Sequence, residues 1–246
     1  MIKIHEVQKS FGPTNVIPDM SLQIPTGETH ILLGSSGCGK TTLLRMMAGL
    51  CDVDSGEVTL GTENIKSLNP YDISDKIGYV IQEGGLMPHL NATENILLPV
   101  KIRRGDLNAA KDKLHDFAQS VELSHQQLLR YPHELSGGQK QRVALIRGLI
   151  LNQPIILLDE PLSALDPVVR MNLQIHLKRL FKKLEKTVVL VTHDLNVASY
   201  LGDKISLLDK GRIVQQGRFS DLLDNPKNDF VRDFIRAQTP AQKENS

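Results

Sequence analysis

One stretch of the chain decides its fold, and it reads Gly34-Ser35-Ser36-Gly37-Cys38-Gly39-Lys40-Thr41-Thr42. It follows the apolar run 31–33 and leads into residues 43–48, which have helical composition and stop at Gly49. A strand, a glycine-rich turn and a helix are the context that the pattern G-x-x-x-x-G-K-[ST] requires. The glycines let backbone N–H groups point inward, and the helix N-terminus adds partial positive charge. The stretch therefore predicts a phosphate-binding loop.

Two residues at the end of this loop indicate which phosphates it binds. Lys40 would reach the β- and γ-phosphates as a point charge, and the Thr41 hydroxyl would ligate Mg²⁺. The alternative is a chance glycine-rich turn, which the Lys-Thr pair in register between a strand and a helix disfavours. We therefore predict a site for a nucleoside triphosphate with Mg²⁺. This loop alone fits kinases, GTPases and many motors, and the ATP-binding proteins that the remaining motifs indicate below.

Composition limits the class of protein. A chain of 246 residues can form one large α/β domain, or a core with a subdomain, and 40% apolar with 23% charged residues is ordinary for a soluble globular protein. A net charge of +1 without a basic arm argues against a nucleic-acid partner. Two cysteines are no disulfide framework, which favours a reducing cytoplasm. No apolar run approaches the roughly 20 residues that a transmembrane helix needs.

Hydrophobic periodicity predicts an α/β alternation that one helical stretch interrupts. Strands are predicted at 1–7, 21–24, 29–33, 57–60, 77–81, 155–158 and 187–191, with a hairpin at 204–209 and 212–217. Phe11 is placed in a loop, and Thr93 is predicted as the N-cap of a short helix ending at 98. Helices are predicted at 109–121, from 136, at 168–183, from 194, at 220–223 and at 229–235. Residues 90–151 contain no strand pattern, so we expect them to form an inserted helical subdomain.

Two further motifs carry chemistry. Leu157-Leu158-Asp159-Glu160 ends a hydrophobic strand with two acids, where Asp159 can hold the Mg²⁺ shell and Glu160 can act as general base. The alternative is a pair of helix N-cap acids. Leu135-Ser136-Gly137-Gly138-Gln139 places glycines and a hydroxyl at a helix N-terminus, a second anion-binding device. That pentapeptide alone could be a capping serine in a flexible turn. The anion-binding interpretation is favoured because, where two copies of the chain meet, each would offer this helix end to the nucleotide of the other.

In their order, these motifs resemble the nucleotide-binding subunits of ATP-binding cassette (ABC) transporters. The glutamine loop at Gln82, the loop Ser163-Ala164-Leu165-Asp166 and the histidine in Thr192-His193-Asp194 match as well. The resemblance covers residues 1–236 as a single ATPase domain and leaves 237–246 as a flexible tail. It implies an α/β P-loop NTPase core with a mainly parallel sheet, an N-terminal antiparallel β subdomain and the inserted helical subdomain at about 90–151.

The resemblance also implies a role for each matching position. Phe11 would stack on adenine, although a place in the core is the alternative. Asp166 would bridge the two nucleotide sites of a dimer. Ser136 and Gly138 would contact the γ-phosphate bound in the opposite subunit. Catalytic roles are implied for Glu160, His193, Gln82 and Lys40, and Mg²⁺ ligation for Thr41, Gln82 and Asp159. Nucleotide contacts are implied for Phe11, Gly34, Ser35, Ser36, Gly37, Cys38, Gly39, Lys40, Thr41, Thr42, Gln82, Ser136, Gly138, Gln139, Asp166 and His193.

Residues 77–90 and 228–234 are similar to bacterial importers of glycine betaine, choline, carnitine or proline. Many of that group carry a C-terminal extension, and here the sequence stops soon after Phe234, so amino-acid importers remain open. The expected partners are a transmembrane permease, an extracytoplasmic solute-binding protein, and a second copy or a paralogue in an ATP-dependent dimer. The expected place is the cytoplasmic face of a bacterial membrane. Two alternatives are a soluble ABC ATPase that acts on ribosomes, nucleic acid or protein complexes, and an inactive binding module.

Overall fold

The computed structural model describes residues 1–82, 84–163 and 165–238. It divides into two compact units, which are described separately: the first comprises Met1–Leu68 with Val189–Ser246, and the second Asn69–Val188. Strand β8 (Thr187–Thr192) begins in the second unit and ends in the first. Three features of the sequence prediction involve residues outside the described ranges: Glu83 in the glutamine loop, Ala164, and the tail residues 239–246.

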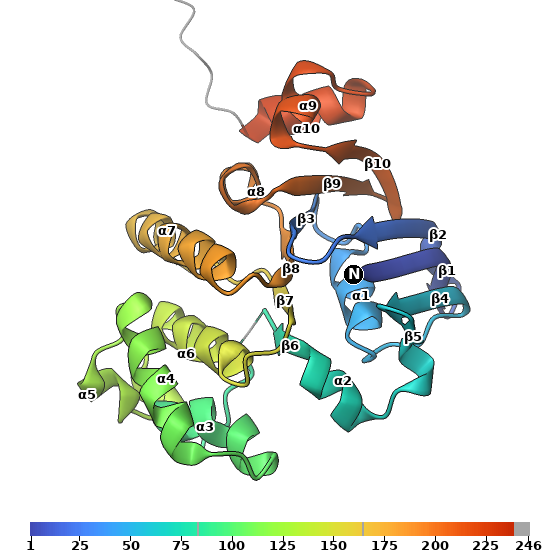
Figure 1. The fold of residues 1–246 in the computed structure, drawn as a ribbon. Helices are drawn as coiled ribbons and strands as arrows, with labels where there is room; N and C mark the ends of the chain where they lie inside the picture. Colours follow the sequence, from blue (N-terminus) through green and yellow to red (C-terminus); the bar gives the residue numbers. More distant parts are fainter. Residues whose placement is uncertain (83, 164, 239–246) are drawn as a thin grey trace, which may run out of the picture. The chain divides into compact units, whose positions relative to one another are not determined.

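An antiparallel sheet and part of a mixed sheet make up the first unit (Figure 1). The antiparallel sheet has the order β2-β1-β4-β5, and the mixed sheet contributes β10-β9-β3-β8. The bounds are β1 (Ile2–Phe11), β2 (Thr14–Ile24), β3 (Thr29–Gly34), α1 (Lys40–Met47), β4 (Ser55–Leu60), β5 (Glu63–Asn64), the 3-10 helix η1 (Ile65–Ser67), α8 (Leu195–Leu201), β9 (Lys204–Asp209), β10 (Arg212–Gly217), α9 (Phe219–Asp224) and α10 (Asp229–Gln238).

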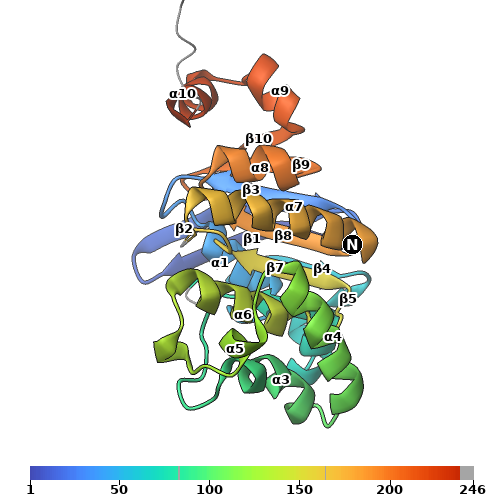
Figure 2. The same cartoon turned by 90° about the vertical axis from the view of Figure 1, so that its left-hand side faces the viewer.

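The second unit is mainly helical (Figure 2). Its strands β6 and β7 pair in parallel, and α3, α4 and α6 pack on one another. The bounds are α2 (Pro70–Lys76), β6 (Ile77–Val80), α3 (Ala92–Ile102), α4 (Leu107–Ser120), α5 (His125–Leu128), the 3-10 helix η2 (Pro132–Glu134), α6 (Gly137–Leu149), β7 (Ile155–Asp159) and α7 (Pro167–Lys183). Among the described residues 90–151 there is no strand, as predicted, but the compact unit is larger, so the subdomain boundary itself stays a prediction.

Strand β3 is buried along its whole length, which explains why it reads as a continuous apolar run. It pairs in parallel with β9, and His30 is the polar exception in its interior. His30 Nδ1 lies 2.8 Å from Glu28 Oε1, and His30 Nε2 lies 2.9 Å from Ser206 Oγ. Because both ring nitrogens have partners, a buried imidazole is tolerated in the strand that carries the phosphate-binding loop.

The predicted fold class is confirmed, and the predicted hairpin is the antiparallel pair β9–β10. Several local predictions are wrong, and strand β2 begins at Thr14 and not at residue 21. Phe11 is the last residue of β1 and pairs with Thr14, because a tight turn lets the strands continue further than the alternation of side chains suggested. Helix α3 is capped by Asn91 instead of Thr93. Helix α10 extends to Gln238, two residues into the predicted tail, and Gln238 Oε1 accepts a hydrogen bond from the Leu195 N–H.

Candidate functional site

The phosphate-binding loop joins β3 to α1 in the first unit, as the sequence predicts. Gly34 ends the strand so close to β9 that a Cβ there would lie 2.5 Å from the Leu208 carbonyl oxygen. Gly39 has φ +101°, and a Cβ there would lie 2.7 Å from Ile17 Cδ1. The Cys38 carbonyl accepts a hydrogen bond from the Gly211 N–H at 3.0 Å. The loop is therefore fixed by β2 and by the β9–β10 turn, and glycine is sterically required at positions 34 and 39.

Lys40 lies inside this loop. Only 5% of Lys40 is exposed, and its Nζ donates to the carbonyl oxygens of Gly34 and Ser35, each at 2.8 Å. The Cys38 sulfur is 3.8 Å from the same nitrogen. Burial raises the pKa of the Cys38 thiol, with the Lys40 charge opposing it, so Cys38 serves as a small uncharged residue in a tight turn. The arrangement holds one ammonium group at the centre of a glycine-rich curve, a site that suits phosphate.

Phe11 and His193 are the other predicted nucleotide contacts of the first unit. The Phe11 ring is 52% exposed and carries the Lys9 ammonium 5.2 Å from its centroid. His193 is exposed and follows β8 directly. The next residue, Asp194, caps α8 by accepting from Asn196 N–H at 2.8 Å. Both side chains are accessible to a ligand, and their contacts with nucleotide stay predictions.

The paired acids lie at the carboxyl end of β7 in the second unit. Asp159 is the last strand residue and is 2% exposed. Glu160 follows with φ +49°, which turns the chain sharply out of the sheet. A buried carboxylate at a strand end and a neighbouring carboxylate outside it are the two positions that metal binding and general base catalysis need.

The segment 135–139 forms the start of α6. Ser136 is the N-cap, and its Oγ accepts from Gln139 N–H at 3.3 Å while Gln139 Oε1 accepts from Ser136 N–H at 3.0 Å. The predicted start of a helix at Ser136 is thus confirmed, and Ser136 is exposed. Asp166 is likewise exposed and caps α7, accepting from Val169 N–H at 3.0 Å. Their predicted contacts with nucleotide, and that of Gln139, stay predictions.

Gln82 is exposed in the loop after β6, and side chains that the sequence did not single out hold that loop. The Arg147 guanidinium donates to the carbonyl oxygens of Gly84 at 2.5 Å and Gly85 at 2.8 Å. Asn95, fully buried on α3, accepts from Met87 N–H at 2.7 Å and donates to the Leu90 carbonyl at 2.9 Å. These contacts link positions far apart in sequence, so no local signal identified them.

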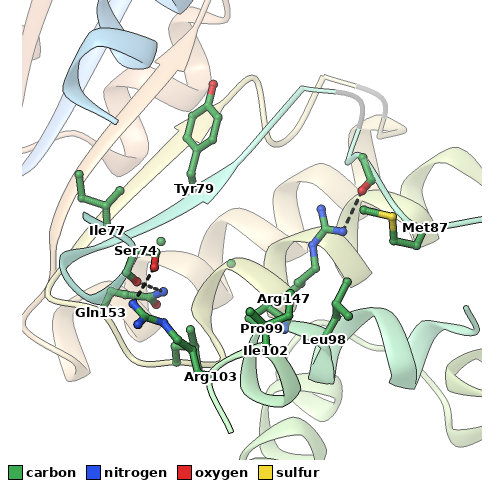
Figure 3. A pocket seen from close by; sticks show the side chains of 14 residues that line it. Ser74, Ile77, Tyr79, Met87, Leu98, Pro99, Ile102, Arg103, Arg147 and Gln153 are labelled. Carbon is green, nitrogen blue, oxygen red and sulfur yellow. Dashed lines mark hydrogen bonds between the residues drawn. The ribbon is translucent and has the colours of Figure 1, made fainter. Parts of the chain in front are cut away.

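A pocket of about 410 Å³ lies beside this loop within the second unit (Figure 3). Arg147 and Met87 lie together on one side of it, and Arg103 points toward Ser74 on the other. Gln153, buried in its wall, donates to the Ser74 carbonyl at 3.3 Å. The lining is mixed, with apolar side chains from Ile77, Met87, Leu98, Pro99, Ile102 and Leu151.

The donor set for a metal ion comprises the Thr41 hydroxyl, the Asp159 carboxylate and the Gln82 amide oxygen. These are hard oxygen donors, the kind that Mg²⁺ prefers, and one carboxylate with substrate phosphates is its usual protein environment. The residues therefore fit Mg²⁺ in their chemistry. That they meet at one ion is a prediction from the sequence motifs.

Known proteins with similar sequences and structures were compared with the chain. Residues 17–163 match a family described as "ABC transporter". The chain is 42% identical over 236 residues to the glycine betaine/carnitine/choline transport ATP-binding protein OpuCA of Bacillus subtilis, covering 96% of this chain and 62% of that protein. It is 39% identical over 235 residues to the glycine betaine uptake system ATP-binding protein YehX of Escherichia coli, covering 96% of this chain and 76% of that protein. The chain thus spans less than two thirds of the length of OpuCA.

The structural comparison agrees. A dimeric post-hydrolysis state of the ATP-binding cassette MJ0796 bound to ADP and Pi has a TM-score of 0.82 and 34% sequence identity, covering 89% of this chain and 99% of that one. The resemblance predicted from the motifs is confirmed.

Proposed function

The chain belongs to the ABC transporter family, and from that premise we propose that it is the ATP-binding and ATP-hydrolysing subunit of a solute importer. The observation that carries the proposal is the loop around Lys40, whose ammonium lies 2.8 Å from two backbone carbonyl oxygens inside a curve fixed by close-packed glycines. A cation held there can meet the β- and γ-phosphates without first having to be ordered.

The proposed reaction transfers the γ-phosphoryl group to water. Glu160 accepts a proton from water while the water oxygen attacks the γ-phosphorus. The bond between the γ-phosphorus and the β,γ-bridging oxygen breaks, and ADP and phosphate leave. Lys40 neutralises charge on the phosphates, and His193 holds the γ-phosphate. Mg²⁺, held by Thr41, Gln82 and Asp159, would supply further charge neutralisation when bound. No covalent intermediate with the protein is needed, because positioning and electrostatics provide the catalysis.

The second part of the proposal is a head-to-tail dimer of this chain with itself or a paralogue. Ser136 and Gly138 would contact the γ-phosphate bound by the other subunit, and Asp166 would bridge the two sites. The exposure of Ser136 and Asp166 supports this arrangement, and so does the similarity to a cassette whose structure is dimeric. Each nucleotide would then form part of a two-fold interface.

The third part is a membrane permease as partner. The described part of the chain has no helix with the length and apolar character that crossing a membrane requires. The similarity to ATP-binding proteins of importers supports a separate chain that provides the pathway for solute. We propose that a segment of the permease docks in the pocket of Figure 3, because Arg147 in its wall also holds the loop that follows Gln82. A docked segment could thereby act on the glutamine loop. The chain would work at the cytoplasmic face of the membrane.

The proposed solute is a quaternary amine or another osmoprotectant, with amino acids as the alternative. The similarity to OpuCA and YehX supports the first. A maltose/maltodextrin import ATP-binding protein, MalK of Yersinia pestis, is also 41% identical over 234 residues. This level of identity therefore does not fix the solute, which fits a subunit whose own residues never contact it; the specificity would come from a solute-binding protein and the permease.

A phosphate-release assay on the full chain tests the enzymatic part. We expect Mg²⁺-dependent hydrolysis by the wild type and a loss of about 10²–10³-fold in Lys40→Ala. Lys3→Ala, which removes an exposed lysine of β1, is the matched control and should hydrolyse normally. A wild type without activity would refute the enzyme. Co-purification with a permease, and ATP-driven uptake of glycine betaine into vesicles holding both, would support transport; salt-sensitive RNA binding without a membrane partner would favour the non-transport class.

A further inference from the structure

The backbone at Glu160 adopts a conformation that a glutamate does not favour. Its φ of +49° lies in the left-handed region, which is strained for a residue with a side chain. Three donors converge on its carbonyl oxygen: Gln141 Nε2 at 2.9 Å, Ser163 Oγ at 3.0 Å and Ser163 N–H at 3.3 Å. The surrounding structure therefore determines where this peptide lies, and with it the origin of the Glu160 side chain.

Gln141 differs from the other donors, which both belong to Ser163, because it lies on a separate element, helix α6. It is only 5% exposed, and its Oε1 is buried with no hydrogen-bond partner among the described residues. A buried acceptor without a donor is destabilising, and an apolar side chain of the same size would avoid that penalty. What the amide provides here, and an apolar residue could not, is the Nε2–H donated to Glu160.

The same face of α6 packs against the loop at a second point. A Cβ on Gly138, one turn before Gln141, would lie 2.7 Å from Leu165 Cδ2. Leu165 is buried, so this contact leaves no room for the loop to move toward the helix. Helix α6 thus restricts Leu165 sterically at Gly138 and bonds the Glu160 carbonyl through Gln141, so it holds the chain after β7 at these two residues.

We propose that Gln141 is a positioning residue for ATP hydrolysis, holding the Glu160 backbone so that the carboxylate projects toward the attacking water. The inference rests on the proposed function, in which Glu160 is the general base. A displacement of about 1 Å at a reacting group can cost about 10²-fold in rate. Removing the Gln141 donor leaves Ser163 to hold the carbonyl, so we expect kcat to fall about 10- to 100-fold while nucleotide binding is kept.

The test is Gln141→Met, which keeps the side-chain volume and removes both the donor and the unpaired oxygen. We expect an unchanged KM for ATP and a Tm equal to or above that of the wild type, with the fall confined to kcat. Gln174→Met on α7, also a buried glutamine of the second unit, is the matched control and should leave kcat unchanged. A wild-type kcat in Gln141→Met would overturn the proposal.

A double variant separates positioning of Glu160 from a general structural effect. In the Glu160→Gln background the base is already lost, so Gln141→Met should lower kcat no further; a second loss of 10-fold or more would refute the proposal. Should Gln141→Met not fold, Ser163→Ala removes a donor to the same carbonyl from an exposed side chain and should lower kcat without a change in KM. Failure of the proposed function would be seen separately, because the wild type itself would then not hydrolyse ATP.

Discussion

Replacing Gly39 by alanine should destabilise the chain more than the same change at Gly37, two residues earlier in the phosphate-binding loop. Both glycines have positive φ, +101° and +79°, so alanine at either position costs about 1–2 kcal/mol of backbone strain. At Gly39 the new Cβ would also lie 2.7 Å from Ile17 Cδ1 and 3.3 Å from the Val16 carbonyl oxygen. Because Ile17 is fully buried, it cannot turn away, and overpacking adds about 1–3 kcal/mol.

The control is built into the comparison, since a Cβ at Gly37 meets nothing within 4 Å. For a chain of this size, the overpacking term corresponds to a further fall in Tm of about 2–12 °C in Gly39→Ala relative to Gly37→Ala. Thermal unfolding of both variants without nucleotide measures it. Equal Tm values would show that Ile17 yields to the new methyl group, and that strain alone requires glycine at this turn.

Three further predictions follow from the site and its supports. Glu160→Gln should keep ATP binding and lose about 10²–10³-fold in turnover. It should accumulate as an ATP-bound dimer, which size-exclusion chromatography would detect. Hydrolysis at the normal rate would show that Glu160 is not the general base. Asn91→Ala should lower the free energy of unfolding by about 1 kcal/mol because it removes the α3 cap, whereas Asn91→Asp keeps a capping oxygen and should lose much less; equal losses in urea unfolding would contradict the capping assignment. At pH 7 a maleimide should modify Cys51 before the buried Cys38, whose raised pKa keeps it protonated until the pH rises further; peptide mass spectrometry gives the order, and reversal would count against that environment.

Local motifs were readable from the sequence where their physics is local. The phosphate-binding loop, the helix start at Ser136 and the β9–β10 hairpin each depend on neighbouring residues, and all three were predicted. The α3 cap was misassigned although a local signal existed: Glu94 Oε2 accepts from the Asn91 N–H at 2.9 Å, completing a capping box that begins at Asn91. Thr93 is also a common cap by residue type, but asparagine ranks above threonine, and the spacing to the glutamate favours Asn91 as well.

Helix α2 was missed for a related reason. None of its residues is buried, so it has no apolar stripe for periodicity to detect. Its start is nevertheless encoded, because Asn69 caps it by accepting from Asp72 N–H at 2.9 Å and Pro70 occupies the first helical position. Cap chemistry would have found what hydrophobic patterning could not.

The supports of the site were not readable, because they join segments distant in sequence. Arg147 reaches the carbonyl oxygens of Gly84 and Gly85 across more than 60 positions, and Gln141 reaches Glu160 across 19. An arginine and a glutamine on a helix are by default solvated side chains, so residue type carries no signal for either role. Only the packing of α6 against both loops reveals them.

Helix α6 therefore connects three motifs that the sequence presents as separate. It begins at the Ser136 cap, bonds the Glu160 peptide through Gln141, and bonds the loop after Gln82 through Arg147. At 1.5 Å per residue, its two bonding residues are about 9 Å apart along the axis, and a capped helix with a buried apolar face does not stretch over that distance. Under the proposed function, a force on the Ser136 end from a bound phosphate, or on the glutamine loop from a docked permease segment, would thus reach Glu160 through the same rigid element.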